Sequence, residues 1–514
     1  MASRARPLDL AAPALAVLLL ALVLAPVAAV AWRGAGLSLG PADWSAVRFS
    51  ITQAFLSAVF STVLAIPVAR ALARRRFPGR SLLITLMGAP FLLPAVVAVL
   101  GLLAVFGRSG ALNSVLFALG LPPISIYGLH GVVLAHVFLN LPLATRMILQ
   151  GWLAIPAERI RLAQSLGFGP SETFRHLEAP MLREVLPGAA MVILVICLTS
   201  FAVVITLGGG PKATTIELSI YQAVRFEFDL GRAATLAGLQ LMIGGLAALA
   251  VWRLSRPADF GAGLDRDLPL RAPPGWRRAG DTLTLAAVTL FLTLPIVAVA
   301  LRGLPGLADL PPSVLPAAGR SILVALVSAL LATATAVAMS LASARGTRPM
   351  IETAATVPLA TSGLVLGTGL FLLIQPFVPP QTLALPVTVL VNMALSLPYL
   401  YRILLPETRA LQADYGRLAD SLSLQGWSRL RWLVLPRLAR PLGFGAGIAA
   451  ALSMGDLGVI ALFAGERQAT LPLVISQLAG AYRMDAAASA ALILVSLSFA
   501  LFWAFDAGGR RAAA

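Results

Sequence analysis

A carboxylate stands inside an apolar stretch of this 514-residue chain, in the run SMGDLG. At the centre of a bilayer such a group costs about 2.5–3.5 kcal/mol, so it usually faces a cavity or a partner. There, Asp456 would attract a cationic solute. The alternative is a packing or capping role beside Gly455 and Gly458.

Amides and hydroxyls form a second group of polar side chains within apolar runs. His136 and Asn140 lie one helical turn apart, and they match Asn392 and Ser396, 256 residues later. We expect these four residues either to line a path through the protein or to hydrogen bond between helices.

The sequence contains no phosphate-binding loop for a nucleotide. A phosphate-binding loop needs Gly-x4-Gly-Lys-Ser/Thr, whereas the only lysine, Lys212, stands between Pro and Ala in GGGPKAT. The only cysteine, Cys197, excludes an intrachain disulfide. We therefore expect no catalytic residue, metal or cofactor in this chain, and any ATP hydrolysis must come from another chain.

The segment from Gly208 to Glu217 is expected to form a loop on the outer side of the membrane.

Composition places the chain in a membrane. It is 59% hydrophobic and 12% charged, whereas about a quarter of the residues of soluble proteins are charged. A bilayer core needs about 20 apolar residues per helix, which predicts an all-α integral membrane protein of about twelve spans. The first run is long for a signal peptide, so we expect it to be retained. The spans are expected near 10–32, 49–72, 81–106, 128–150, 186–207, 232–253, 282–302, 318–343, 351–375, 383–405, 441–463 and 486–506.

The net charge of +17 is explained by membrane topology rather than by binding to a nucleic acid. Most of the 39 Lys and Arg residues fall in short loops on one side of the predicted spans if the N-terminus is cytoplasmic. This is the positive-inside pattern, and it predicts that both termini are cytoplasmic.

One polar, Arg-rich segment occurs twice. The first island is Arg161 to Pro180, and the second island is Arg417 to Pro436. Both begin Arg-Leu-Ala, continue with Ser-Leu and end at Pro, and both are cytoplasmic on the predicted topology. Surface helices at the membrane interface are the alternative. Matched spacing in two copies favours a two-fold partner that docks on both.

Each island predicts a short amphipathic helix, a turn and a second short helix. The second island breaks at Gln425–Gly426, and the first breaks at Gly167 to Pro170. The apolar stripe is expected to comprise Leu411, Tyr415, Leu418 and Leu422 in the second copy, and Ile155, Leu162 and Leu166 in the first.

The repeat extends over both halves of the chain. Residues 254–280, rich in Pro, Gly, Asp and Arg, predict a linker between a first half at 1–253 and a second half at 281–514. The repeated loops lie at 155–185 and 411–441. An even number of spans in each half makes the halves parallel repeats.

The islands resemble the cytoplasmic loop of the membrane subunits of binding-protein-dependent ABC importers. That loop reads Glu-Ala-Ala, three residues, Gly, nine residues, Ile, one residue, Leu-Pro. Here Arg161 and Arg417 stand in place of the Glu, and Ser423 in place of the Gly. The stretches RRRFPGR, YGLHGVVLAHVFLNLP and LGGGPKATTIELSIYQA are similar to the fused two-half permeases of thiamine and thiamine-phosphate importers. Related permeases for ferric iron share this architecture.

The resemblance implies a type I ABC importer permease in a bacterial inner membrane. It would receive thiamine or thiamine phosphates from a periplasmic binding protein, and two copies of a cytoplasmic ATP-binding subunit would dock on the islands. The docking residues it implies are Arg161, Leu162, Ala163, Leu166, Gly167, Pro180, Arg417, Leu418, Ala419, Leu422, Ser423 and Pro436. The expected translocation path comprises His136, Asn140, Asn392, Ser396 and Asp456. The rivals are an ion-coupled secondary transporter, which predicts several buried carboxylates, and a non-transporting scaffold.

Overall fold

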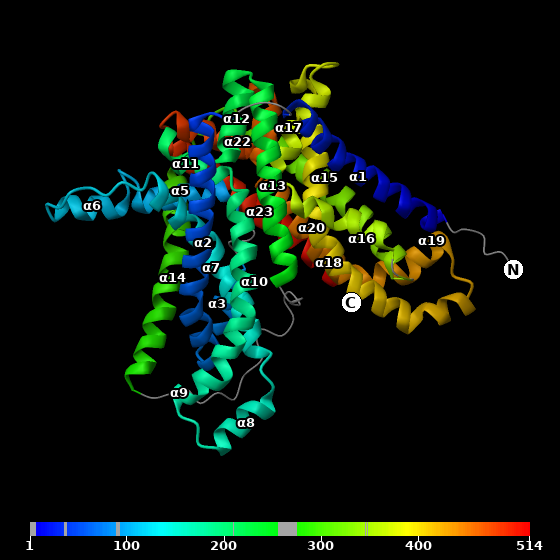
Figure 1. Cartoon of the computed structure of the whole chain (residues 1–514), viewed down its shortest axis with the longest axis horizontal. Coiled ribbons are helices and arrows are strands. Elements are labelled where there is room, and N and C mark those ends of the chain that lie inside the picture. Colours follow the sequence, from blue (N-terminus) through cyan, green and yellow to red (C-terminus); the bar gives the residue numbers. More distant parts are fainter. Residues whose placement is uncertain are drawn as a thin grey trace. The chain divides into compact units, whose positions relative to one another are not determined.

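The computed structural model describes residues 7–34, 39–88, 93–208, 210–254, 275–344, 346 and 348–513, and every regular element within them is helical. The chain divides into two compact units (Figure 1). Unit 1 comprises residues 1–43, 216–242 and 306–514, and unit 2 comprises residues 44–215 and 243–305. The expectation of an all-α fold is confirmed.

Unit 2 contains most of the first half of the chain. Its helices are α2 (Pro41–Arg74), α3 (Arg80–Leu86), α5 (Ala95–Phe106), α6 (Ala111–Ala118), α7 (Leu129–Leu153), α8 (Ala157–Ser165), α9 (Pro170–Thr173), η1 (Phe174–Glu178), α10 (Ala179–Leu198), α11 (Ala202–Leu207), η2 (Pro211–Ala213) and α14 (Trp276–Gly303).

Unit 1 contains most of the second half. Its helices are α1 (Pro7–Gly34), α12 (Ile216–Gln222), η3 (Ala223–Glu227), α15 (Val314–Ser343), α16 (Pro349–Thr356), η5 (Val357–Ala360), α17 (Gly363–Ile374), η6 (Pro380–Leu383), α18 (Ala384–Ser421), α19 (Gly426–Arg429), η7 (Leu430–Val434), α20 (Leu435–Met454), α21 (Gly458–Phe463), η8 (Glu466–Gln468), α22 (Leu471–Gly480) and α23 (Met484–Ala513). The helices α13 (Leu230–Leu254) and η4 (Pro305–Leu307) each have residues in both units, and the first three residues of α2 belong to unit 1.

The expected number of spans agrees with the structure. Eleven helices among the described residues are long and apolar enough to cross a membrane, or up to twelve if a bent pair is one span. The bent pair joins residues 349–360 to 363–374 at 100° and corresponds to the ninth expected span. Ser362 begins its second segment, because its side chain accepts a hydrogen bond of 3.1 Å from the backbone N–H of Val365.

Each unit contains helices from the other half of the sequence: unit 1 includes α1, α12, η3 and the beginning of α13, and unit 2 includes α14. The N-terminal α1 packs in unit 1 against α15, α16 and α17, whereas α14, the first helix after the expected linker, packs in unit 2 against α5. The compact units therefore do not coincide with the sequence halves at 1–253 and 281–514. Most of the expected linker, residues 255–274, lies outside the described residues.

A glycine permits the close approach of α14 and of α1. A Cβ added to Gly101 of α5 would lie 2.6 Å from the carbonyl oxygen of Pro295 in α14. A Cβ added to Gly369 of α17 would likewise collide with the carbonyl of Pro26 in α1. Small residues let helix backbones approach closely in membrane proteins. The two contacts thus use the same device, a proline inside a long helix against a glycine in a short one.

Enlarging either glycine should destabilise the fold. We expect Gly101→Val and Gly369→Val each to cost about 1–3 kcal/mol, because the added atoms meet backbone rather than a side chain that can move. Thermal unfolding in lipid nanodiscs measures this. Gly319→Val is the matched control, since no heavy atom lies within 4 Å of a Cβ at Gly319. An equal loss in the control would contradict the explanation.

Candidate functional site

The two islands adopt the same succession of helices. In the first, α8 is followed by a turn, α9 and the π-helical turn η1. In the second, the end of α18 is followed by a turn, α19 and the π-helical turn η7. The elements α9, η1 and α10 begin 256 residues before α19, η7 and α20. π-helical turns are rare and frequently lie at functional sites. Another one, η3, lies outside the islands, so what the two loops share is the matched position of the turn within the repeat.

Both turns are closed by a residue in the left-handed conformation. Gly167 has φ 72° and Ser423 has φ 54°. In each, the residue after it donates a backbone hydrogen bond of 2.9 Å to the carbonyl of Ala163 or Ala419. A left-handed conformation costs about 1–2 kcal/mol for a residue other than glycine, so Ser423 carries a strain that Gly167 does not. The second turn therefore lies at Ser423, earlier than the break predicted at Gln425–Gly426.

The helix before the turn differs between the copies. In the first island Pro156 precedes α8 and separates it from α7, as expected from the missing N–H of proline and its restriction of the preceding residue. The equivalent residue of the second island is Gln412, and there α18 continues unbroken to Ser421. The prediction of a separate short helix is therefore correct for the first island and wrong for the second.

Four leucines of the expected docking set are exposed at matched positions. Leu162 and Leu166 are 59% and 62% exposed, and Leu418 and Leu422 are 55% and 62% exposed. Ala163 and Ala419 instead lie buried on the inward face, and the remaining expected docking residues outside the turns, Arg161, Pro180, Arg417 and Pro436, are exposed.

The predicted apolar stripe of the second island is only partly correct. Leu411 is buried, whereas Leu418 and Leu422 face outward. The inward face is formed farther along by Gly416 and Ala419. The predicted stripe is therefore split between two faces of the helix. The small residues Gly416 and Ala419 lie against the rest of unit 1, and Leu418 and Leu422 are exposed on the other face.

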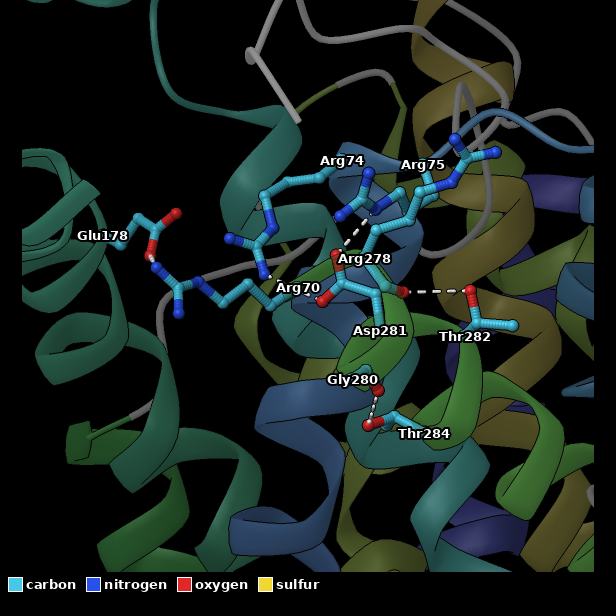
Figure 2. Close-up of polar contacts among 9 residues, drawn as sticks. All are labelled: Arg70, Arg74, Arg75, Glu178, Arg278, Gly280, Asp281, Thr282 and Thr284. Carbon is cyan, nitrogen blue, oxygen red and sulfur yellow. Dashed lines mark hydrogen bonds and ion pairs between the residues drawn. The ribbon is translucent and has the colours of Figure 1, made fainter. Parts of the chain in front are cut away.

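Ion pairs attach the first island to the rest of unit 2 (Figure 2). Glu178, the last residue of η1, is 2% exposed, and its Oε2 lies 2.7 Å from Nη2 of Arg70 on α2. One turn farther along α2, Arg74 and Arg75 contact the carboxylate of Asp281 on α14 at 3.0 and 2.7 Å. These charges tie the loop to α2, and α2 to α14.

Hydrogen bonds between its own side chains stabilise the second island. Arg429 donates hydrogen bonds to the side chains of Asp420 and Gln412 at 3.0 and 2.8 Å, and it is 8% exposed. These bonds join α19 to the end of α18 across the turn.

The expected path residues of unit 2 form a buried polar cluster. Asn140 Nδ2 donates to the carbonyl of His136 at 2.9 Å and contacts Cys197 Sγ at 3.5 Å. Ser57 Oγ lies 3.2 Å from His136 Nδ1, and Gln53 Nε2 donates to the carbonyl of Cys197 at 2.9 Å. Together they link α2, α7 and α10. The role of His136 and Asn140 in a path stays a prediction.

Unit 1 contains the matching cluster. Asn392 Nδ2 donates to Ser453 Oγ at 2.9 Å, and Ser396 Oγ donates to the carbonyl of Asn392. Ser453 is the equivalent of Cys197, 256 residues later. The sequence match of 136 and 140 with 392 and 396 therefore extends to their hydrogen-bonded neighbours. Of the two roles expected for these residues, the contacts correspond to hydrogen bonding between helices.

Asp456 lies in a break of a span rather than inside a helix. Residues 455–457 separate α20 from α21, and the carboxylate lies against the backbone amides of Gly458, Val459 and Ile460 at the start of α21. Its Oδ2 has no hydrogen-bond partner. The position beside these amides fits the capping alternative.

Sequence reasoning missed the burial of the Glu217 carboxylate. Glu217 was assigned to an outside loop, but it is the second residue of α12 and is 1% exposed. Burial raises the pKa of Glu217 to about 8, against hydrogen bonds from Ser362 and Gln240 that lower it. The helical spacing of Ile216 and Ile220, both fully buried, was the signal that could have placed it.

Curated relatives match the chain over most of its length. The Thiamine transport system permease protein ThiP of Salmonella typhimurium is 40% identical over 481 residues, which cover 89% of this chain and 88% of the relative. The proteins of the same name from Brucella abortus and Haemophilus influenzae are 38% and 34% identical, over 90% and 89% of this chain and 87% of each relative. No protein-family model matches.

The burial of Glu217 predicts a pH dependence of stability. Between the unfolded pKa of 4.5 and the folded pKa of about 8, the folded protein holds a proton that the unfolded chain releases. The free energy of unfolding should therefore fall as the pH rises through this window. Glu217→Gln should lose this part of the dependence when unfolding temperatures are compared between about pH 5 and pH 8. The exposed Glu158→Gln is the control, and a wild-type slope in Glu217→Gln would refute the assignment.

Proposed function

This chain belongs to the family of thiamine transport system permease proteins, and we propose that it is the membrane-spanning subunit of an ABC importer that moves thiamine or thiamine phosphates into the cytoplasm. The observation that carries this proposal is the 40% identity over 89% of the chain. The chain is a multi-pass inner-membrane permease and not an enzyme. In this proposal ATP hydrolysis belongs to a separate subunit.

The charge distribution supports the orientation we propose. With both termini in the cytoplasm, the Arg-rich loops fall on the cytoplasmic side, as the positive-inside rule requires. Both islands then face the cytoplasm, and the opposite face is available to a periplasmic binding protein loaded with substrate.

We propose that one ATP-binding subunit docks on each island. The exposed pairs Leu162 with Leu166 and Leu418 with Leu422 offer the same apolar surface twice. Arg161 and Arg417, in place of the acidic residue of related loops, would offer cationic contacts beside it. Because the left-handed turn and the helices after it repeat at one offset, the two ATPase subunits would bind through the same surface. Closure of the ATPase pair would then move both islands together.

For the translocation path we propose the buried polar clusters and Asp456. Thiamine carries a permanent positive charge on its thiazolium ring, and the unpartnered Oδ2 of Asp456 would stabilise that charge. His136 and Asn140, with their counterparts Asn392 and Ser396, would exchange bonds between helices for bonds to substrate when the bundle opens. The chain would alternate between outward-open and inward-open states.

Reconstitution distinguishes this proposal from its rival. Proteoliposomes containing the chain, the ATPase subunit and the binding protein should accumulate labelled thiamine only when ATP is supplied. An ion-coupled secondary transporter would instead use Glu217 and Asp456 as relays. Uptake that follows a proton gradient without ATP would overturn the proposal.

Charge placed on an island should uncouple the ATPase. We expect Leu162→Asp and Leu418→Asp each to lower substrate-stimulated ATP hydrolysis roughly tenfold or more, because a buried interface leucine replaced by a carboxylate loses about 2 kcal/mol. Both variants should reach the membrane in wild-type amounts. Leu162→Met and Leu418→Met keep the apolar surface and are the matched controls. Unchanged stimulation in the Asp variants would exclude the islands as docking sites.

A further inference from the structure

The two islands contact their units at equivalent positions, one through charged side chains and the other through apolar side chains. In unit 2, one arginine holds η1 through two of its residues. Arg70 Nη2 lies 2.7 Å from Glu178 Oε2 (Figure 2). The guanidinium carbon of Arg70 also lies 5.3 Å from the ring centroid of Phe174. The charged contact is an ion pair rather than an aligned hydrogen bond. Ion pair and cation–π contact together fix η1 against α2.

The equivalent contact in unit 1 is apolar. The offset of 256 residues places Leu430 and Val434 of η7 at the positions of Phe174 and Glu178. Earlier in the halves the offset is 271 residues, since Ser50 and Arg74 recur as Ser321 and Arg345, and it places Leu341 of α15 at the position of Arg70. Leu341, Leu430 and Val434 belong to one hydrophobic cluster, in which Val434 is 2% exposed. The same two elements therefore meet at the same point in both units, once through charge and once through packing.

The two kinds of contact respond differently to substitution. Removing one partner of a buried ion pair leaves an uncompensated charge and is strongly destabilising, whereas replacing both partners by packed apolar residues is often neutral. Glu178 is almost fully buried and Arg70 is about three-quarters buried, with side-chain exposures of 2% and 27%. The trio in unit 1 is thus a natural example of the apolar replacement.

The ion pair also continues into a second helix. One turn beyond Arg70, Arg74 and Arg75 both contact Asp281 of α14. Their side chains are only 11% and 14% exposed, so water screens these contacts weakly. Charged contacts therefore run without a gap from η1 to α2 and from α2 to α14.

We propose that Arg70 and Glu178 are positioning residues that transmit the movement of the first island to α2 and α14, and that Leu341 and Val434 transmit the movement of the second island by packing. The inference rests on the proposed function, since it assumes that the islands move with the ATPase subunits. It goes beyond that function because it makes the two routes chemically unequal. The first depends on a charge pair, and the second does not.

A substitution cycle tests the inference. Arg70→Leu and Glu178→Val are made singly, and the triple variant Arg70→Leu, Phe174→Leu, Glu178→Val copies the contact of unit 1. The reconstituted importer is assayed for thiamine transported per ATP hydrolysed and for binding of the ATPase subunit to the chain. Arg48→Leu, an exposed cation at the other end of α2, is the matched control.

The singles should lower transport per ATP roughly tenfold, because each leaves one buried charge unpaired. ATPase binding should stay within about twofold of wild type, because no docking leucine has changed. The triple variant and the control should recover wild-type coupling. Singles that couple normally, or a triple variant as impaired as the singles, would overturn the inference. Glu178→Gln, which keeps the side-chain size, replaces Glu178→Val if that variant does not reach the membrane.

A spin label gives a readout that does not need transport. Cys197 is buried, so a nitroxide reacts selectively with Arg175→Cys on the exposed face of η1. Its mobility should increase in each single variant and return to the wild-type level in the triple variant. Mobility unaffected by the singles would overturn the inference even if thiamine transport is normal. Absent transport in the wild type, with mobility changing as expected, would instead count against the proposed function alone.

Discussion

A bilayer leaves an unpaired backbone N–H or C=O without water to bind, so a membrane protein has to compensate every interruption of a spanning helix. This chain interrupts its spans repeatedly and meets the requirement locally. Ser362 caps the helix that restarts after the 100° bend. Asp456 lies against the amides that begin α21. The breaks are thus places where polar groups can exist within the membrane, and the candidate path residue Asp456 occupies one of them.

The two copies of the repeat preserve backbone geometry more strictly than side-chain chemistry. The left-handed turn, the π-helical turn and the break in the span recur at one offset, the break lying between α10 and α11 in one copy and between α20 and α21 in the other. Yet a glycine at the turn becomes Ser423, and Cys197 becomes Ser453. The ion pair of one island likewise becomes a hydrophobic contact in the other. A shared geometry is what two identical partners would require of two docking loops, whereas the contacts behind each loop need only be stable.

Apolar run length predicted the spans well, and the polar pattern predicted the helices of the first island, because both are local properties of the chain. The exchange of α1 and α14 between units was not predictable from them. Hydrophobic periodicity tells which face of a helix is apolar, but it does not identify the neighbour that covers it. The contacts of Gly369 with Pro26 and of Gly101 with Pro295 determine that choice, and each joins residues far apart in sequence. Glu217 was misplaced for a similar reason, since its burial depends on Ser362 and Gln240.

The central claim is that one chain supplies two equivalent docking surfaces for the same ATPase subunit. Native mass spectrometry of the complex, released from nanodiscs, measures this stoichiometry directly. The account predicts one copy of this chain with two copies of the ATPase subunit. It also predicts that Leu418→Asp yields a complex with a single copy. A wild-type complex that holds one ATPase subunit or none would contradict the account.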